Sequence, residues 1–217
     1  MLLCHLNINS IQNKFDELAY LIHKLKAHII FIGETKIDST YPNSQFNIPG
    51  YSLFRNDRKK GGEGILAFVS AVIPCKSLKF SRIYKCIEAI ALEITIGRKE
   101  MIMIGMYLPL RAPNGNYELA LSHICNWASL QEEIVAVTGD LNFDRLRPNW
   151  SEGKLLIDLE PEQGFECLIK EPTRIERKGA TTTSTLIDVL LSNRPEIFKQ
   201  CGKIGRASCR ERVYVLV

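Results

Sequence analysis

Ile134-Val135-Ala136-Val137-Thr138-Gly139-Asp140-Leu141-Asn142 is the stretch that decides the fold. It begins with an apolar run rich in β-branched residues, which is typical of a buried strand, and it ends in a glycine followed by polar residues. A carboxylate is tolerated at the mouth of such a strand, where it meets water, a metal ion or a substrate. Gly-Asp and Asn also form ordinary turns, so this stretch alone leaves a simple turn open. We expect Asp140 and Asn142 at the end of a core strand.

The same construction recurs along the chain. Apolar segments that carry an oxygen-bearing side chain at or near their ends are Leu2–Ile8 with Asn7 and Asn9, Ile29–Gly33 with Glu34, Met101–Tyr107, and Leu186–Asn193 with Asp188. None of these polar groups is His or Cys, and oxygen-only sets suit Mg²⁺, Mn²⁺ or Ca²⁺ better than zinc. Mg²⁺ binds through one or two carboxylates, waters and a substrate phosphate. These residues therefore indicate a hydrolase of phosphate esters.

The apolar patterns between these segments predict two packed sheets with helices outside, in an α/β (α+β) fold. Ile11–Leu25 has one apolar face and predicts a helix capped by Asn9 or Ser10. Further expected elements are hairpins Gly50–Arg55/Ile65–Val69 and Ile90–Ile96/Met101–Tyr107, a helix beginning at Asn114–Asn116, a short helical piece around Leu155–Leu159, and a strand Phe165–Ile169. Strands and helices thus alternate with hairpins within one domain.

Composition is that of a soluble globular protein. The chain has 217 residues, of which 46% are hydrophobic and 24% charged, enough for one domain with a full core. Its seven cysteines form no Cys-x-x-Cys pair, which favours reduced core thiols inside a cell over disulfides or a zinc site. No signal peptide or run of 18 apolar residues is present, so we expect no membrane partner. The net charge of +4 weakly favours an anionic partner.

Residues 204–217 need separate treatment. Ile204–Val213 resembles the conceptual translation of a common DNA sequencing adapter. We therefore expect residues 1–203 to be the native domain, incomplete at its C-terminus. Residues 204–217 are expected to be an artefact that does not belong to the native fold. A genuine basic C-terminal strand is the alternative.

Six motifs stand in the order found in the endonuclease/exonuclease/phosphatase superfamily. They are Leu6–Asn9, Ile32–Lys36, the glycines Gly61, Gly62 and Gly64, Met106–Tyr107, Gly139–Asn142 and Leu186–Asp188. Within that superfamily, the stretches that most resemble the apurinic-like endonuclease domain of LINE-type non-LTR retrotransposons are Asn7–Ser10, Asn13–Leu18, Ile48–Tyr51 and Arg55–Arg58. The resemblance covers residues 3 to 200, and the order of the motifs makes it specific where any one motif would be weak.

The resemblance implies a four-layer α/β/β/α sandwich with a divalent metal, Mg²⁺ or Mn²⁺, at one edge. Glu34 would be the main metal ligand, with Asn7 nearby and Asn9 where relatives often carry an acid. Tyr107 would touch the phosphate or its nucleophile, and Asp140 would position the attacking water. Asn142 would hold a phosphate oxygen, and Asp188 would brace a catalytic histidine.

That histidine is missing from its expected place. The family pattern ends in Ser-Asp-His after the Asp188 strand, and this chain contains no such tripeptide. The four histidines, His5, His23, His28 and His123, do not match it, and we expect them to be structural or solvated. We therefore expect a domain that lacks a metal-site acid, the histidine and a closing strand, with little activity or none. Asp188 could instead be a structural acid braced by Arg174 or Lys170.

Arg55, Arg58, Lys59 and Lys60 flank the glycine-rich turn. They fit either a solvated hairpin or a contact with the DNA backbone, which would give sequence-neutral affinity. The resemblance implies DNA as partner, a reverse transcriptase domain in cis, a nuclear location and a monomer. A phosphoinositide or small phosphate-ester hydrolase of the same fold, and a remnant that only binds nucleic acid, are the alternatives to a DNA-nicking endonuclease.

Overall fold

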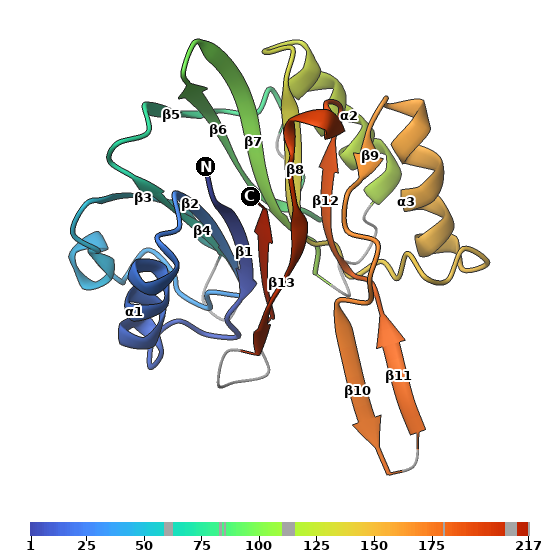
Figure 1. Ribbon diagram of the computed structural model, residues 1–217, viewed down its shortest axis with the longest axis horizontal. Coiled ribbons are helices and arrows are strands. Elements are labelled where there is room, and N and C mark those ends of the chain that lie inside the picture. Colours follow the sequence, from blue (N-terminus) through green and yellow to red (C-terminus); the bar gives the residue numbers. More distant parts are fainter. Residues whose placement is uncertain are drawn as a thin grey trace.

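Two sheets packed face to face form the body of the molecule. The computed structural model describes residues 1–58, 63–82, 84, 86–109, 116–179, 181–206 and 212–216. Within them the chain forms two six-stranded sheets, with helices on the outer faces of the pair (Figure 1). This confirms the predicted mixed α/β fold with two packed sheets.

The first sheet has the strand order β13-β14-β1-β2-β4-β3. Its strands are β1 (Leu3–Asn7), β2 (Ile29–Gly33), β3 (Tyr51–Asn56), β4 (Ile65–Ser70), β13 (Cys201–Arg206) and β14 (Arg212–Leu216). β1 and β2 are parallel and are connected by helix α1 (Phe15–Leu25). Leu18 and Ile22 of α1 are buried in a cluster with Ile30 and Ile32 of β2. This apolar face fixes α1 against the outer side of the sheet.

The second sheet has the order β5-β6-β7-β8-β12-β9. Its strands are β5 (Cys75–Leu78), β6 (Glu88–Ile96), β7 (Lys99–Tyr107), β8 (Val135–Asp140), β9 (Glu166–Cys167) and β12 (Asp188–Ser192). β7 and β8 are parallel and are connected through α2 (Tyr117–Ser129), while α3 (Ser151–Glu162) follows β8. Short 3₁₀ helices occur at Asn43–Phe46 and Pro195–Ile197. The paired strands β10 (Arg174–Lys178) and β11 (Thr181–Thr185) form a ribbon that projects from the body (Figure 1).

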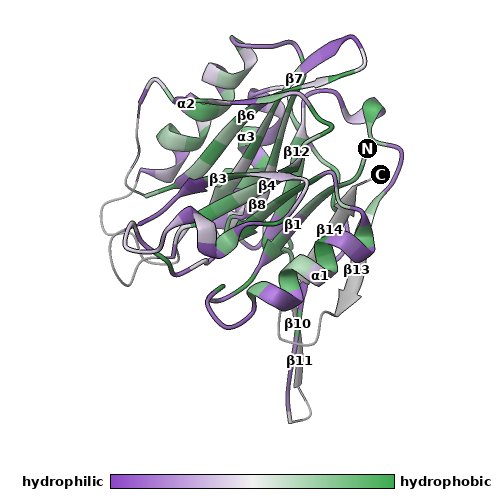
Figure 2. Cartoon of the chain, turned by 90° about the vertical axis from the view of Figure 1, so that its left-hand side faces the viewer, coloured by the Kyte–Doolittle hydropathy of each residue, from purple (hydrophilic) through white to green (hydrophobic). Residues whose placement is uncertain are grey.

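The main core lies between the two sheets. Because side chains alternate along a strand, Leu3 of β1 and Ile29 and Phe31 of β2 face the second sheet. Phe31 reaches so close to β7 that a Cβ on Gly105 would lie 2.1 Å from its ring, so a glycine is required there. Apolar residues accordingly follow the strands of both sheets (Figure 2).

Some predicted boundaries were wrong. α1 begins at Phe15, and neither Asn9 nor Ser10 caps it. Both residues have positive φ, and the Ser10 amide donates to the Glu34 carbonyl, so this loop is tied to the end of β2 and the helix starts later. α3 is longer and β9 shorter than the patterns indicated, and the exposed strands β5, β10 and β11 were not predicted.

The C-terminal strands occupy the edge of the first sheet. β14 pairs antiparallel with β1, and β13 pairs with β14. β14 therefore covers the β1 edge of the first sheet. The boundary expected at residue 203 falls inside β13, and the origin of residues 204–217 stays a prediction.

Four cysteines are buried and free, namely Cys4, Cys86, Cys125 and Cys167, as predicted for core thiols. Burial raises the pKa of the Cys4 and Cys125 thiols to about 12. None of the helices in the described parts of the chain combines the length and apolar character needed to cross a bilayer.

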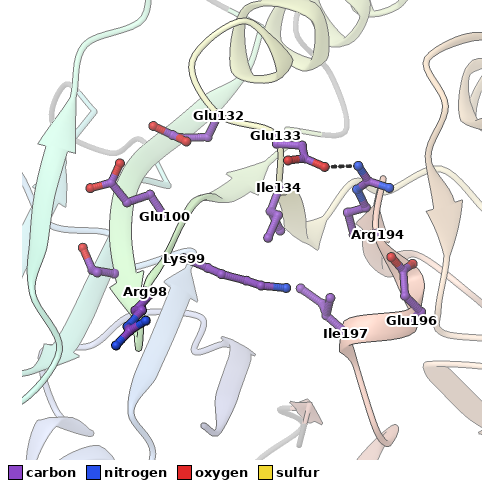
Figure 3. A pocket seen from close by; sticks show the side chains of 10 residues that line it. Arg98, Lys99, Glu100, Glu132, Glu133, Ile134, Arg194, Glu196 and Ile197 are labelled. Atoms are coloured by element: carbon purple, nitrogen blue, oxygen red, sulfur yellow. Dashed lines mark hydrogen bonds and ion pairs between the residues drawn. The ribbon is translucent and has the colours of Figure 1, made fainter.

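A cavity of about 590 Å³ opens at one end of the second sheet. Its lining includes Arg98 and Lys99 at the start of β7, Glu133 and Ile134 before β8, and Arg194 after β12 (Figure 3). Because β7 and β8 are parallel, this is the end opposite to Tyr107 and Asp140. The cavity is therefore separate from the predicted catalytic residues.

Candidate active site

Four oxygen-bearing side chains lie in one row across the second sheet. Glu88 of β6 is opposite Tyr107 of β7, Tyr107 is opposite Asp140 of β8, and Asp140 is opposite Asp188 of β12. Residues opposite each other on neighbouring strands share a face. The buried strands therefore deliver these groups to one edge of the interface between the sheets.

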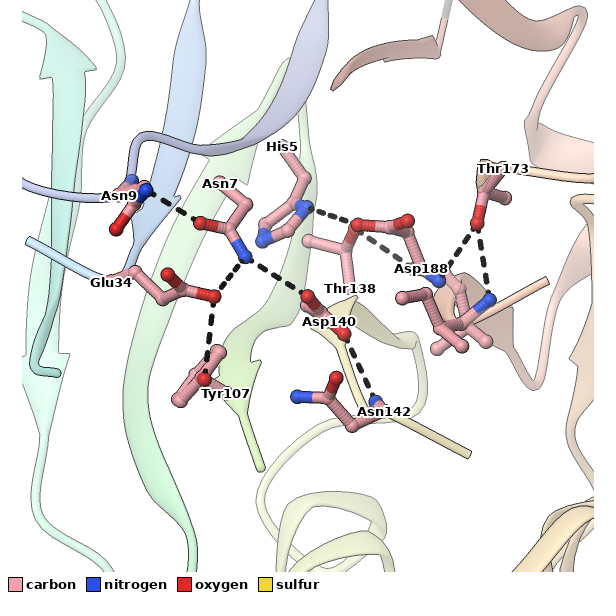
Figure 4. Close-up of polar contacts among 12 residues, drawn as sticks. His5, Asn7, Asn9, Glu34, Tyr107, Thr138, Asp140, Asn142, Thr173 and Asp188 are labelled. Carbon is pink, nitrogen blue, oxygen red and sulfur yellow. Dashed lines mark hydrogen bonds and ion pairs between the residues drawn. The ribbon is translucent and has the colours of Figure 1, made fainter. Parts of the chain in front are cut away.

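The first sheet contributes Asn7 and Glu34 to the same place. Asn7 ends β1, and Glu34 directly follows β2. The Asn7 amide nitrogen donates to Glu34 Oε1 at 2.6 Å and to Asp140 Oδ2 at 3.0 Å (Figure 4). One amide group thus joins two carboxylates that come from different sheets.

Tyr107 and Asn142 complete this cluster. The Tyr107 hydroxyl donates to Glu34 Oε1 over 3.4 Å. The Asn142 backbone amide donates to Asp140 Oδ1 at 3.0 Å, and its side-chain amide donates to the Leu108 carbonyl at 2.7 Å. Both Asp140 oxygens are therefore fixed in direction. The structure brings together five of the residues that the sequence assigned to catalysis or metal binding.

Backbone strain is concentrated in the loops around this cluster. Six non-glycine residues in the described parts of the chain have positive φ, and one of them, Lys26, ends α1. The other five are Asn9, Ser10, Glu34, Lys36 and Asn142. Such conformations cost energy and persist where the surroundings impose them, often at functional sites. The loops after β1, β2 and β8 are thus held in unfavourable shapes beside the carboxylates.

The electrostatics of the cluster are dominated by burial. Burial and, after it, the nearby Asp188 carboxylate raise the pKa of Asp140 to about 8, against the opposing effect of the hydrogen bonds from Asn7 and Asn142. Burial also raises the pKa of Tyr107, with Glu34 as the next cause. Glu88 has its pKa raised to about 7 by burial, against the attraction of Arg58.

Asp188 lies beside a histidine that the sequence did not assign to the site. His5 Nδ1 is 3.8 Å from Asp188 Oδ1, and both side chains are buried. Burial lowers the pKa of His5 to about 4. The Thr173 hydroxyl accepts from the Asp188 backbone amide at 3.2 Å.

The bracing residues suggested for Asp188 are engaged elsewhere. Lys170 pairs with Glu166 at 3.0 Å, and Arg174 pairs with Glu176. Spacing along the chain gave no signal for the contact with His5, because 183 positions separate it from Asp188.

Asn9 lies at the margin of the cluster. Its backbone amide donates to Asn7 Oδ1 at 3.3 Å, and its side-chain oxygen accepts from Lys36 Nζ. Lys36 is a neighbour of the site that the sequence did not assign, although it belongs to the Ile32–Lys36 motif.

The four cations expected to contact DNA differ in their surroundings. Arg55 is committed internally, because its guanidinium donates to Asp57, Asn43 and the Tyr41 and Asp38 carbonyls, and only 9% of the side chain is exposed. This arrangement favours a bracing role. Arg58 is partly exposed and pairs with Glu88 at 3.1 Å. Lys59 and Lys60 lie outside the described residues.

The fold defines the class of protein to which the chain is similar. Its fold is similar to that of endonuclease/exonuclease/phosphatase proteins, as the motifs predicted. One of them, an endonuclease/exonuclease/phosphatase family protein from Leptotrichia buccalis, has a TM-score of 0.70 and 12% identity, with coverage of 100% of this chain and 98% of that one.

Two further solved structures come nearer in shape. The endonuclease domain of TRAS1, a telomere-specific non-LTR retrotransposon, has a TM-score of 0.76 and 15% identity over 99% of this chain and 96% of that one. The AP endonuclease LMAP from Leishmania major also has a TM-score of 0.76, with 8% identity over 99% of this chain and 87% of that one. At these identities the likeness is one of fold. No protein-family model and no curated protein sequence matches the chain.

Proposed function

We propose that this chain is a metal-dependent phosphodiesterase domain that nicks DNA, of the kind encoded by LINE-type retrotransposons. The observation that carries the proposal is the Asn7 amide, which joins Glu34 to Asp140 across the two sheets. Two carboxylates held together at the edge of the sheets are suited to bind a cation and to orient water at a phosphate. Two similar structures are an endonuclease domain and an AP endonuclease by name, which supports DNA as the substrate.

Mg²⁺ or Mn²⁺ fits this donor set. In the described residues, no three His, Cys, Asp or Glu side chains are grouped so that they could hold a metal ion alone. Mg²⁺ does not need such a group, because waters and a substrate phosphate complete its shell. Glu34, which is only partly buried, would hold the ion beside Asn7, while the Asn9 oxygen is already taken by Lys36. When bound, the ion would neutralise charge on a phosphate oxygen.

The remaining residues act on water and phosphate. Asp140 would orient the attacking water and accept its proton, because hydrogen bonds from Asn7 and Asn142 fix both of its oxygens. Asn142 would hold a phosphate oxygen with its second amide hydrogen, since the first is bonded to the Leu108 carbonyl. The Tyr107 hydroxyl would turn from Glu34 towards the phosphate.

The β10–β11 ribbon would extend the DNA contact. Thr173, directly before β10, accepts from the backbone amides of Ile187 and Asp188, so the ribbon is anchored at the cluster. It carries exposed Arg177 and Lys178. Such cations contact phosphates without reading sequence. We further propose that such a nick serves a reverse transcriptase in cis, and that the parent protein acts in the nucleus as a monomer.

Relaxation of supercoiled plasmid tests the proposal. We expect the chain to produce open circles slowly with Mg²⁺ or Mn²⁺ and to stop on addition of EDTA. The slow rate follows from the missing Ser-Asp-His tripeptide. Glu34→Gln and Asp140→Asn should each lower the rate by about 100-fold or more. Glu132→Gln, which changes the cavity at the far end of the sheet, is the matched control and should leave the rate unchanged.

Two other results would overturn the proposal. Turnover of phosphoinositides or other soluble phosphate esters, with intact plasmid, would make the chain a small phosphate-ester hydrolase. Salt-sensitive retention of DNA that ignores EDTA, without cleavage of either substrate, would make it a remnant that only binds nucleic acid.

A further inference from the structure

The buried histidine of β1 is unexplained by the proposed chemistry. His5 is 1% exposed, and its two ring nitrogens have no hydrogen-bond partner in the described residues. Buried polar atoms are nearly always hydrogen-bonded, so each exception calls for a reason. An apolar residue would fill this position at lower cost. The ring nevertheless lies within the polar cluster, between Asn7 and Asp188 (Figure 4).

The two nitrogens of the ring face different surroundings. Nδ1 faces Asp188 Oδ1 at 3.8 Å. Nε2 lies on the side of Gly33, where an added Cβ would be 3.8 Å from it and 3.4 Å from Tyr107. A neutral imidazole has one N–H donor and one acceptor, and an ionised carboxylate only accepts. The surroundings therefore favour the tautomer with hydrogen on Nδ1.

We propose that His5 is a positioning residue, whose Nδ1–H group orients Asp188 and through it the neighbouring Asp140. The separation of 3.8 Å exceeds a hydrogen bond by about 1 Å, which a small shift of one sheet towards the other would close. His5 lies on β1, two residues before Asn7, and Asp188 lies opposite Asp140 in the second sheet. The contact thus links the strand that bears Asn7 to the strand pair that bears both aspartates. This inference rests on the proposed function only in the experiment that measures DNA nicking.

The tautomer can be measured without any activity. In protein labelled with ¹⁵N-histidine, the ring signals of His5 are assigned by their loss in His5→Asn. We expect the Nδ1–H form in the unmodified chain. Asp188→Leu has nearly the shape of Asp but no acceptor, and it should abolish this preference. An Nε2–H ring in the unmodified chain, or a spectrum unchanged by Asp188→Leu, would overturn the proposal.

A matched pair of variants tests the role in catalysis. Asn at position 5 places an amide N–H near the site of Nδ1, whereas Leu has the same branching without a donor. His5→Leu should lower kcat for plasmid nicking by about tenfold or more with KM within about twofold, and His5→Asn should restore most of kcat. Equal losses in the two variants, at equal folded content by circular dichroism, would overturn the positioning role. If the unmodified chain does not nick DNA, the proposed function fails, and the tautomer measurement still decides this inference.

Discussion

Asp140 and Asp188 lie directly opposite each other on the neighbouring antiparallel strands β8 and β12. Burial raises the pKa of Asp140, and repulsion from the Asp188 carboxylate is the next cause of the rise. The hydrogen bonds from Asn7 and Asn142 stabilise the ionised form only in part. Ionisation of both aspartates therefore carries a cost in stability.

The first prediction concerns stability against pH. The Asp140 pKa is about 8 in the folded chain and near 4 in the unfolded one, so between these values the folded state binds more protons. The contribution of Asp140 is fully present below about pH 4 and is lost as the pH rises towards 8. Urea unfolding of the metal-free chain should show this loss, and Asp140→Asn should show a much flatter profile. Equal pH profiles for the two proteins would contradict it.

The second prediction concerns a carboxylate in place of the bridging amide. Asn7→Asp removes the donor shared by Glu34 and Asp140 and adds a third carboxyl group to the cluster. We expect the metal-free variant to lose about 1–3 kcal/mol of unfolding free energy and to gain more than the parent from saturating Mg²⁺. Thermal unfolding with and without Mg²⁺ measures both effects. The control Asn47→Asp, at an exposed position, should change neither the unfolding free energy nor the stabilisation by Mg²⁺. A similar response to Mg²⁺ in both variants would count against the site.

The third prediction concerns the segment after Asn142. Arg145 contacts Glu160 of α3 through two hydrogen bonds, of 2.7 and 2.8 Å, and the Glu160 side chain is 8% exposed. Arg145→Met leaves this carboxylate buried and unpaired, which should cost about 2–4 kcal/mol in urea unfolding. The control Lys170→Met breaks a pair whose side chains are more than half exposed, and it should cost about 0.5 kcal/mol or less. A similar loss of unfolding free energy in the two variants would show that the Arg145–Glu160 pair does not anchor the segment after Asn142.

The fourth prediction concerns the ribbon. The double variant Arg177→Ala/Lys178→Ala removes two exposed cations, so the slope of log affinity for duplex DNA against log salt should fall by about 1.8. Fluorescence anisotropy over a salt series measures the slope. Lys76→Ala removes a cation that pairs with Glu93 on β6, and it should leave the slope unchanged. An unaltered slope in the double variant would exclude the ribbon from the DNA surface.

Local patterns were sufficient for the strands that build the site. Alternation and apolar runs predicted β1, β2, β7, β8 and β12, because a buried strand has an apolar pattern in its own sequence. They failed at the ribbon, where Thr181–Thr185 is mostly exposed and has no apolar pattern. They also misplaced the start of α1, because long-range hydrogen bonds from the β2 loop hold Ser10 out of the helix.

The sequence by itself determined the two-sheet fold and predicted a site of oxygen-bearing side chains at strand ends, since ordered motifs and apolar runs are local features. Only the tertiary structure decided which groups meet. Asn7 is 133 positions from Asp140, and the hydrogen bond between them depends on how the two sheets pack. The same packing places His5 beside Asp188 and turns Arg55 inward. Contacts between distant segments follow from the burial of whole faces of the sheets, so the spacing of residues along the chain does not predict them.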